Sequence, residues 1–245
     1  MHFYGEDLAT LHHTHYSTLA RDAATYLHQR LSTLGKHRAR VFDLGCGSGV
    51  SAAVLASLGH SVHGVDVSSA MIAQARKTAP TATFAVDTIT DVTIPLCDGI
   101  LAIGESMTYQ HSADYGKGAV AHAIQRCIGS LRSPAILLCD VLLTSIAEEL
   151  QHDMTATYPQ FTVRVEASID RDVLHRTITT IRHGNDEHPA RQCVEDHRQV
   201  LLQPSDLLDL AFDIARQGYS TSILTDVGKA PFRKGHVALE IRAID

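Results

Sequence analysis

The chain has 245 residues, of which 44% are hydrophobic and 20% charged, so it can bury the core of one large domain or two small ones. Its 27 Asp and Glu residues outnumber its 21 Lys and Arg residues, whereas a general nucleic-acid-binding protein usually carries a basic excess. Because it has scattered cysteines, no secretion signal and no apolar window of about 18 residues, we expect a cytoplasmic protein with no membrane contact.

The first regular pattern covers residues 5–34, where apolar side chains recur at helical spacing and Gly35 follows as a C-cap. From residue 40 onward, short apolar strands alternate with helices. The expected strands cover residues 40–44, 61–65, 83–86, 98–103 and 135–139, and the expected helices cover residues 48–58, 68–77 and 118–131. This alternation is typical of β-α-β units, so we predict an α/β fold with a Rossmann-like, mostly parallel sheet and helices on both faces.

The pattern changes after Pro159, where three expected strands follow one another without a helix between them. They cover residues 161–167, 173–181 and 194–202, and they predict a small antiparallel β insertion at residues 160–202. A helix over residues 205–217 and an antiparallel pair over residues 221–225 and 236–244 complete a seven-stranded main sheet. We interpret residues 1–245 as one domain with a helical cap at residues 1–35. The insertion would be a lid or the subunit contact of a homodimer.

A glycine-rich turn, Asp43-Leu-Gly45-Cys46-Gly47-Ser48-Gly49, joins the first expected strand to the next helix. Glycines there allow a ligand to approach the backbone closely, and the helix N-terminus offers free N–H groups. A dinucleotide fingerprint that starts at Gly45 would need Gly or Ala at position 50, where the chain has Val50. A P-loop would need a lysine, and no Lys occurs between residues 37 and 76. Both phosphate-binding interpretations are therefore disfavoured.

The pattern D-x-G-x-G-x-G resembles the first motif of class I S-adenosylmethionine (SAM)-dependent methyltransferases. Asp66 and Asp87 end the second and third expected strands, and Gly104-Glu105 follows the fourth, in the order of that family. The resemblance covers residues 39–141 in detail. It implies SAM as the cofactor, ribose hydroxyls bound by Asp66 and adenine contacted by Asp87. The residues that it assigns to the cofactor site are Asp43, Gly45, Cys46, Gly47, Gly49, Asp66, Val67, Met71, Asp87, Thr88, Gly104 and Glu105.

Two further segments resemble a small-molecule subgroup of the same family. They are Gly104-Glu-Ser-Met-Thr-Tyr109 and Leu8-Ala-Thr-Leu-His12, the latter followed by Tyr16. The resemblance implies methyl transfer to an N or O atom of a small molecule by in-line displacement. Such a transfer needs alignment, and it needs a base only where the acceptor must lose a proton. We expect His111 as the first candidate base and Tyr109 as the second. The expected substrate pocket includes His12, Tyr16 and His197.

Several alternatives stay open beside this interpretation. Asp66 could cap a helix, Asp87 could occupy a turn, and His197 could lie on an exposed strand face. The cluster His12-His13-x-His15 does not place three imidazoles on one helical face, so we predict no metal site. The chain could also be a non-catalytic SAM-binding or regulatory protein of the same fold. An NAD-dependent oxidoreductase is disfavoured by Val50, and an RNA methyltransferase by the acidic charge.

Overall fold

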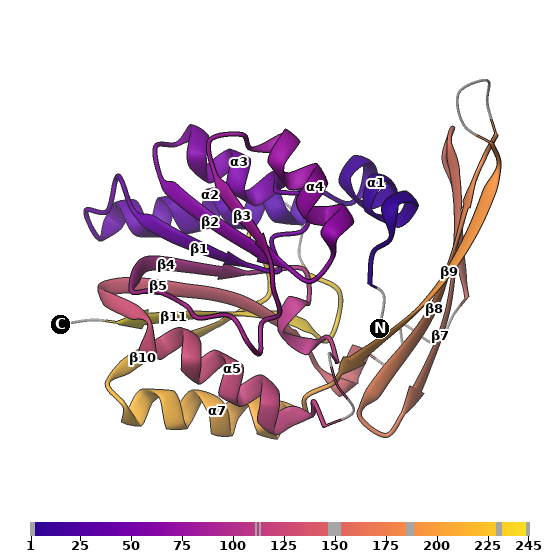
Figure 1. Ribbon diagram of the computed structural model, residues 1–245. Helices are drawn as coiled ribbons and strands as arrows, with labels where there is room; N and C mark the ends of the chain where they lie inside the picture. Colours follow the sequence, from indigo (N-terminus) through magenta and orange to yellow (C-terminus); the bar gives the residue numbers. More distant parts are fainter. Residues whose placement is uncertain are drawn as a thin grey trace.

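The computed structural model describes residues 3–110, 112, 114–146, 153–184, 189–228 and 232–243, which build two separate sheets (Figure 1). The larger sheet has seven strands in the order β10-β11-β5-β4-β1-β2-β3. Its strands are β1 (Arg40–Leu44), β2 (Ser61–Asp66), β3 (Thr83–Val86), β4 (Cys97–Ala102), β5 (Leu131–Leu142), β10 (Tyr219–Leu224) and β11 (His236–Ala243). β1 to β5 run parallel, and β11 pairs antiparallel with both β5 and β10. The predicted fold class is confirmed.

The centre of the large sheet is buried on both of its faces. All six residues of β4 are buried, and so are the last four of the five residues of β1. Helices α2 (Thr18–Thr33), α3 (Val50–Ser57) and α4 (Ser69–Thr78) cover one face, and α5 (Lys117–Gly129) and α7 (Pro204–Arg216) cover the other (Figure 1). A central parallel strand between two helical layers favours a continuous apolar run, which is why β1 and β4 were recognisable from the sequence.

The expected N-terminal helix over residues 5–34 is two helices. α1 (Glu6–His15) ends at Tyr16, and α2 begins after Ser17. α1 packs against α4 and the small sheet, whereas α2 packs against α3, β4 and β5. Each helix therefore buries its apolar side against a different partner, and the chain changes direction between them. Hydrophobic spacing cannot reveal such a break, because both helices keep the helical period.

The small sheet has four strands, one more than the sequence predicted. They are β6 (Met154–Thr157), β7 (Phe161–Asp170), β8 (Val173–Arg182) and β9 (Arg191–Val200), all antiparallel. None of the side chains of β6 is fully buried, so its sequence carries little of the alternation that marks a half-buried strand. β5 is also longer than expected, because its extension continues to pair with β11 as far as Leu142. Two short 3-10 helices, η1 (Ser106–Thr108) and η2 (Thr144–Ile146), follow β4 and β5.

α1 joins the small sheet to the rest of the molecule. Leu8 and Leu11 of α1 pack with Phe161, Val163 and Ile178 of β7 and β8 in one apolar cluster. The buried carboxylate of Asp7 adds ion pairs to Arg182 (3.2 Å) and Arg191 (2.7 Å). The small sheet stands beside one end of the large sheet with α1 next to it (Figure 1). This arrangement places a second wall opposite the strand ends where a ligand would bind.

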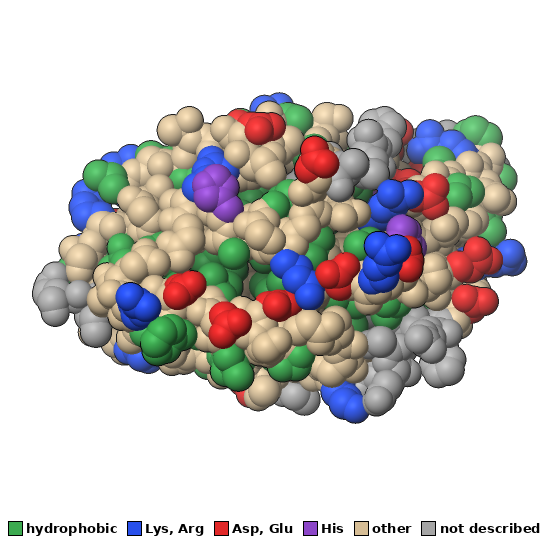
Figure 2. Space-filling model, turned by 90° about the horizontal axis from the view of Figure 1, so that it is seen from below, with side chains coloured by type: hydrophobic (Ala, Val, Ile, Leu, Met, Phe, Trp, Pro, Cys, Tyr) green, Lys and Arg blue, Asp and Glu red, His purple; other side chains and the backbone are tan. Residues whose placement is uncertain are grey.

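The outer face formed by α5 and α7 mixes acidic, basic and apolar side chains (Figure 2). α7 buries Leu207, Leu210 and Ile214 and exposes Leu208 and Phe212. Gln203 and Asp206 form a capping box at its N-terminus, so the chain leaves the small sheet in a fixed direction. Within the described residues, no helix combines the length and the hydropathy needed to cross a membrane.

Candidate active site

The turn after β1 lies at the centre of the large sheet, where the next strand in the chain, β2, is one neighbour of β1 and the later strand β4 is the other. Such a switch point leaves a crevice beyond the carboxyl ends of the strands. Gly45, Gly47 and Gly49 all have positive φ, but their surroundings differ. A Cβ on Gly45 would lie 2.5 Å from the Ser106 Cβ, and one on Gly49 would lie 2.8 Å from the Ala75 Cα. On Gly47, a Cβ would meet nothing closer than the Met71 Sδ at 4.0 Å. Gly45 and Gly49 therefore serve close packing, and Gly47 leaves open space at the crevice.

Asp66 at the end of β2 holds this turn in place. Its Oδ2 accepts a hydrogen bond from the Gly47 N–H (2.9 Å), and its Oδ1 accepts one from the Ser68 N–H (2.8 Å). Burial raises the pKa of Asp66, and the two backbone hydrogen bonds oppose that rise. Ser68, in turn, caps α4 by accepting from the Met71 N–H. The carboxylate thus ties the ends of β1 and β2 together and remains at the wall of a cavity.

Two adjoining cavities occupy the crevice, and they share part of their walls. The smaller has a volume of about 100 Å³ and the larger about 510 Å³. Both are lined by Tyr4, His12, Gly45, Gly47, Ile103, Gly104 and Tyr109. The smaller adds two carboxylates and several apolar side chains, namely Asp66, Asp87, Val67, Met71 and Ile89. The larger adds apolar side chains of α1, β7 and β8 together with charged residues that include Glu105, Arg176 and His236. The crevice is thus a two-chambered site with a glycine-lined junction.

Asp43 lies beneath the glycine-rich turn, in the wall of the larger chamber. The Ser51 hydroxyl donates a hydrogen bond of 2.5 Å to its Oδ2. Burial raises the pKa of Asp43 to about 7, while the Ser51 hydrogen bond lowers it and the nearby charge of Asp66 adds to the rise. The Asp43 carboxyl therefore titrates close to neutral pH.

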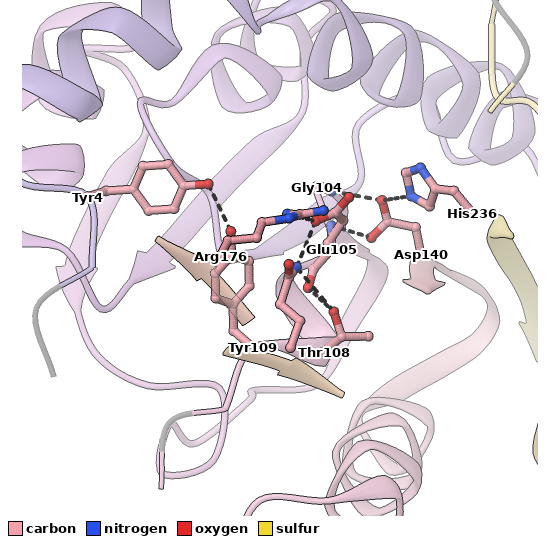
Figure 3. Close-up of polar contacts among 9 residues, drawn as sticks. Tyr4, Gly104, Glu105, Thr108, Tyr109, Asp140, Arg176 and His236 are labelled. Atoms are coloured by element: carbon pink, nitrogen blue, oxygen red, sulfur yellow. Dashed lines mark hydrogen bonds and ion pairs between the residues drawn. The ribbon is translucent and has the colours of Figure 1, made fainter. Parts of the chain in front are cut away.

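The turn after β4 is held in an uncommon conformation by Asp140 of β5. Gly104 and Glu105 have φ values of 88° and 65°, and the left-handed region costs a side chain such as that of Glu105 about 1 kcal/mol or more. The Asp140 carboxylate accepts from both backbone N–H groups, at 2.9 Å from Gly104 and 2.8 Å from Glu105 (Figure 3). The buried carboxylate thereby fixes the backbone at the junction of the two chambers.

The Glu105 side chain forms a buried ion pair with Arg176 of β8. Its Oε2 accepts from the Arg176 Nη1 at 2.8 Å (Figure 3). The same oxygen accepts from the Gln199 Nε2 at 2.7 Å. Burial alone would raise the pKa of Glu105, but the Arg176 charge and the two hydrogen bonds hold it at about 2. The ion pair joins the large sheet to the small sheet across the larger chamber, and Glu105 stays ionised at neutral pH.

Aromatic side chains form the wall where the two chambers meet. The Tyr4 and Tyr109 hydroxyls lie 2.9 Å apart (Figure 3). The His197 ring packs edge-on against Tyr109. Burial raises the pKa of Tyr4 to about 12 and also raises that of Tyr109 well above its ordinary value, so both phenols stay protonated at neutral pH. Burial lowers the pKa of His12 to about 4, so its imidazole is neutral.

Most of the residues predicted from the sequence lie at this site. The residues that line one or both chambers are Asp43, Gly45, Cys46, Gly47, Asp66, Val67, Met71, Asp87, Gly104, Glu105, Tyr109, His12 and Tyr16. Gly49 packs against α4 instead, and the Thr88 hydroxyl bonds to Asp91. His197 is buried behind Tyr4 and Tyr109, with its Nε2 3.1 Å from the Glu195 Oε2. His111 lies outside the described residues. The roles assigned to all of these residues stay predictions.

Sequence reasoning missed Tyr4, Arg176 and His236, which line the larger chamber, and Asp140, which bonds to Gly104 and His236 behind its wall. Asp140 carried a usable signal, because it directly follows the expected apolar strand at residues 135–139, much as Asp66 and Asp87 follow theirs. Arg176 and His236 carried none, since each reaches the site only through the pairing of distant strands. Within the described residues, no three His, Cys, Asp or Glu side chains gather as metal ligands would.

Comparison with known proteins gives one family match and many structural neighbours. Residues 41–130 match the family described as "Methyltransferase domain". A SAM-dependent methyltransferase from Clostridium acetobutylicum has a TM-score of 0.80 at 11% identity, over 96% of this chain and 98% of that chain. The sugar N-methyltransferase KedS8 from Streptoalloteichus sp. has a TM-score of 0.76 at 18% identity, over 100% and 97%.

CalS10 from Micromonospora echinaspora, an amino pentose methyltransferase solved with SAM bound, has a TM-score of 0.71 at 12% identity and covers 99% of both chains. A comparison with curated proteins finds no match. At these identities, the structural likeness establishes a common fold over nearly the whole chain, including the small sheet.

Proposed function

We propose that this chain is a class I SAM-dependent methyltransferase that transfers the methyl group of SAM to an N or O atom of a small molecule. The match of residues 41–130 to a methyltransferase domain and the fold shared with solved methyltransferases support this proposal. The observation that carries this proposal is the two-chambered crevice. The smaller chamber offers two carboxylates beside apolar side chains, and the larger one adjoins it along shared walls of glycines and aromatic side chains. A cofactor and an acceptor can therefore meet at that junction.

The smaller chamber fits the adenosine part of SAM in its chemistry. Carboxylates accept hydrogen bonds from hydroxyl and amino groups, and Asp66 and Asp87 both face the chamber. Val67, Met71 and Ile89 supply apolar surface for a planar base. Gly47 and Gly104 line both chambers, and no atom lies close to the position that a Cβ would take at either residue. A side chain at either position would therefore project into the space at the junction. These features support Asp66 as the residue that binds the ribose hydroxyls.

SAM supplies a methyl group that its sulfonium has already activated for in-line displacement. The protein then has to align the acceptor and to exclude water. α1, β7 and β8 border the larger chamber with Leu8, Leu11, Val163, Val165 and Ile178. We assign to the small sheet the role of a lid over the acceptor, with the Glu105–Arg176 ion pair as its attachment to the large sheet. His111 and Tyr109 stay proposals for groups near the acceptor. Because Tyr109 is protonated, it would donate a hydrogen bond.

Small-molecule acceptors are favoured by the size of the larger chamber. Its volume of about 510 Å³ lies in the range of small-ligand sites, which is about 300–1,000 Å³. Two of the structural neighbours are described as sugar N-methyltransferase and amino pentose methyltransferase, which supports amino sugars as the first compounds to try.

The five cysteines support a reducing compartment such as the cytoplasm. All five are free thiols in the structure, and four of them are buried. A scattered set of unpaired cysteines is typical of proteins that stay in such a compartment.

The proposal is tested by measuring release of S-adenosylhomocysteine from SAM with a panel of amino sugars, small amines and phenols. We expect release with at least one member of the panel and none with the panel omitted. Asp66→Ala should lower release at limiting SAM, because it weakens cofactor binding. If SAM binds but no member of the panel gives release, the proposal of small-molecule transfer fails and the non-catalytic SAM-binding alternative gains support.

A further inference from the structure

We propose that His236, held by Asp140, is the base that takes the proton from the acceptor atom during methyl transfer. This inference rests on the proposed function and assigns a catalytic residue to it. His236 begins β11 and Asp140 lies in β5, and neither was singled out from the sequence. The two residues are therefore brought together only by the antiparallel pairing of β5 and β11.

The geometry is that of a buried carboxylate that orients an imidazole at the wall of a cavity. The His236 Nε2 lies 2.8 Å from the Asp140 Oδ2 (Figure 3). The Asp140 side chain is 0% exposed, whereas that of His236 is 9% exposed and lines the larger chamber. A histidine that acts as a general base is commonly held in this way by a carboxylate, which fixes its tautomer and stabilises its protonated form.

The same carboxylate connects His236 to the junction of the two chambers. The Asp140 Oδ2 also accepts from the Gly104 N–H, and Gly104 lines both chambers. His236 and the backbone of Gly104 thus share one acceptor atom, which places the imidazole beside the point where cofactor and acceptor would meet. Asp140 is a positioning residue in this scheme, because it acts through His236 and through the turn.

The tautomer follows from the hydrogen bond. Because a carboxylate only accepts hydrogen bonds, the neutral ring must carry its proton on Nε2, and the lone pair is on Nδ1. Among the residues that the structure describes, Nδ1 has no hydrogen-bond partner. The Phe232 ring packs 4.3 Å from the His236 ring between centroids and fixes its plane.

The charged groups around His236 favour the protonated ring on balance. Burial lowers the pKa of His236, but the Asp140 hydrogen bond and the charges of Asp140 and Glu105 raise it by more, and Arg233 opposes them. These groups come from β5, from the turn after β4 and from the segment before β11. A proton that reaches the ring is therefore stabilised next to the Asp140 carboxylate.

The step balances without any further reactant. The acceptor N–H or O–H gives its proton to the His236 Nδ1, and the acceptor atom bonds to the methyl carbon. The bond between carbon and sulfur breaks, and its electrons go to the sulfur, which leaves the neutral thioether S-adenosylhomocysteine. The imidazolium at His236 then loses its proton to water, and the neutral ring is restored.

A purely structural role for the pair would be to fasten β11 to β5. That fastening is already provided by the backbone, since the two strands pair from His236 opposite Leu142 to Ala243 opposite Ala135. The Asp140–His236 hydrogen bond lies at the end of this ladder, at the cavity, and adds nothing to its register.

The first test needs no acceptor. Full-length protein with ¹⁵N-labelled histidine is titrated by NMR, and the His236 signals are identified by their loss in His236→Gln. We expect the neutral ring to be the Nε2–H tautomer, to titrate above its ordinary value, and to titrate at lower pH in Asp140→Asn. An Nδ1–H tautomer, or a titration that Asp140→Asn leaves unchanged, would overturn the proposal.

The second test measures methyl transfer with the most active compound of the panel described above. His236→Gln keeps a hydrogen-bond donor for Asp140 but cannot take the proton, so kcat should fall about 10²–10⁴-fold while the SAM affinity and the Tm stay unchanged. In the wild type, kcat should rise with pH as His236 loses its proton, and this rise should be absent in His236→Gln. His63→Gln, at a histidine that is bonded to Thr83 and does not line either chamber, should behave as wild type. Full activity of His236→Gln would refute the base while leaving the methyltransferase proposal intact. Absence of SAM binding in the wild type would instead refute the proposed function.

Discussion

Two buried carboxyl groups at the site have pKa values that are shifted in opposite directions. Glu105 is buried yet strongly ionised, because Arg176 lies 2.8 Å from it. Asp43 is buried beside the Ser51 hydroxyl and the like charge of Asp66, and its pKa is raised to about 7. Such shifts cluster where proteins bind or transform ligands, so the two carboxyls mark the crevice independently of any motif.

Replacing Asp66 by Ala is expected to weaken SAM binding about ten- to a hundred-fold. Charge-assisted hydrogen bonds to the ribose hydroxyls would be lost, and these contribute about 1.5–3 kcal/mol. Isothermal titration calorimetry measures the change, with Asp209→Ala on the exposed side of α7 as the control. Unchanged SAM affinity in Asp66→Ala would reduce Asp66 to a support for the Gly47 turn.

Gly47→Ala and Gly35→Ala form a matched pair. Both glycines have positive φ, 50° and 72°, so both substitutions should cost about 1–2 kcal/mol of stability. Only the Gly47 Cβ would enter the chambers, so only Gly47→Ala should also weaken SAM binding. Thermal unfolding and calorimetry on both variants separate the two effects. Equal SAM affinity in both variants would argue against a ligand at this turn.

Asp43 gives a pH-dependent prediction. Its folded pKa lies above its unfolded value, so the native state holds a proton that the unfolded state loses between about pH 4 and 7. The carboxyl therefore costs stability as the pH rises through this range. Asp43→Asn should raise the Tm relative to wild type, by an amount that grows from pH 4 to pH 7 and is constant above it. The gain at pH 8 corresponds to about 1–4 kcal/mol. A difference in Tm that shrinks with rising pH would contradict the raised pKa.

At the scale of elements, α1 depends on its contacts with the small sheet. The Asp7 side chain is 4% exposed and pairs with Arg182 and Arg191. The side chain of Glu6 beside it is 80% exposed and lies 3.5 Å from Arg191. A short helix such as this is held by its packing more than by its own propensity. The closure of the larger chamber therefore depends on Asp7.

Asp7→Ala is expected to destabilise the protein by about 2–3 kcal/mol, somewhat less than the usual cost of breaking a buried pair because Arg191 is exposed. Glu6→Ala should change stability by about 0.5 kcal/mol or less. Hydrogen exchange across Glu6–His15 should speed up only in Asp7→Ala. The same exchange rate in both variants would show that the apolar cluster alone holds α1.

The elements also show what the sequence could and could not predict. β1, β4 and the glycine-rich turn were predicted because their signals are local, an apolar run and a fixed spacing of residues. The break at Tyr16, the strand β6 and the dyad of Asp140 and His236 depend on contacts between distant segments. No local pattern records such contacts, which is why the cofactor side of the crevice was more predictable than the acceptor side.

For the molecule as a whole, each of the two sheets contributes a different wall of the crevice. The large sheet places its switch point at the smaller chamber, and the small sheet with α1 encloses the larger chamber from the opposite side. The structural neighbours share this arrangement over nearly their entire length, with coverage of 97–99% of their own chains. This division is the arrangement that the proposed function requires, with the cofactor at the large sheet and the acceptor beside the small sheet.

Calorimetric titration of the protein with SAM and with NAD is the most direct test of this account. We expect micromolar binding of SAM or S-adenosylhomocysteine and little binding of NAD, because the glycine spacing and the small chamber suit an adenosine without a second nucleotide. Tighter binding of NAD than of SAM would contradict the account at its centre.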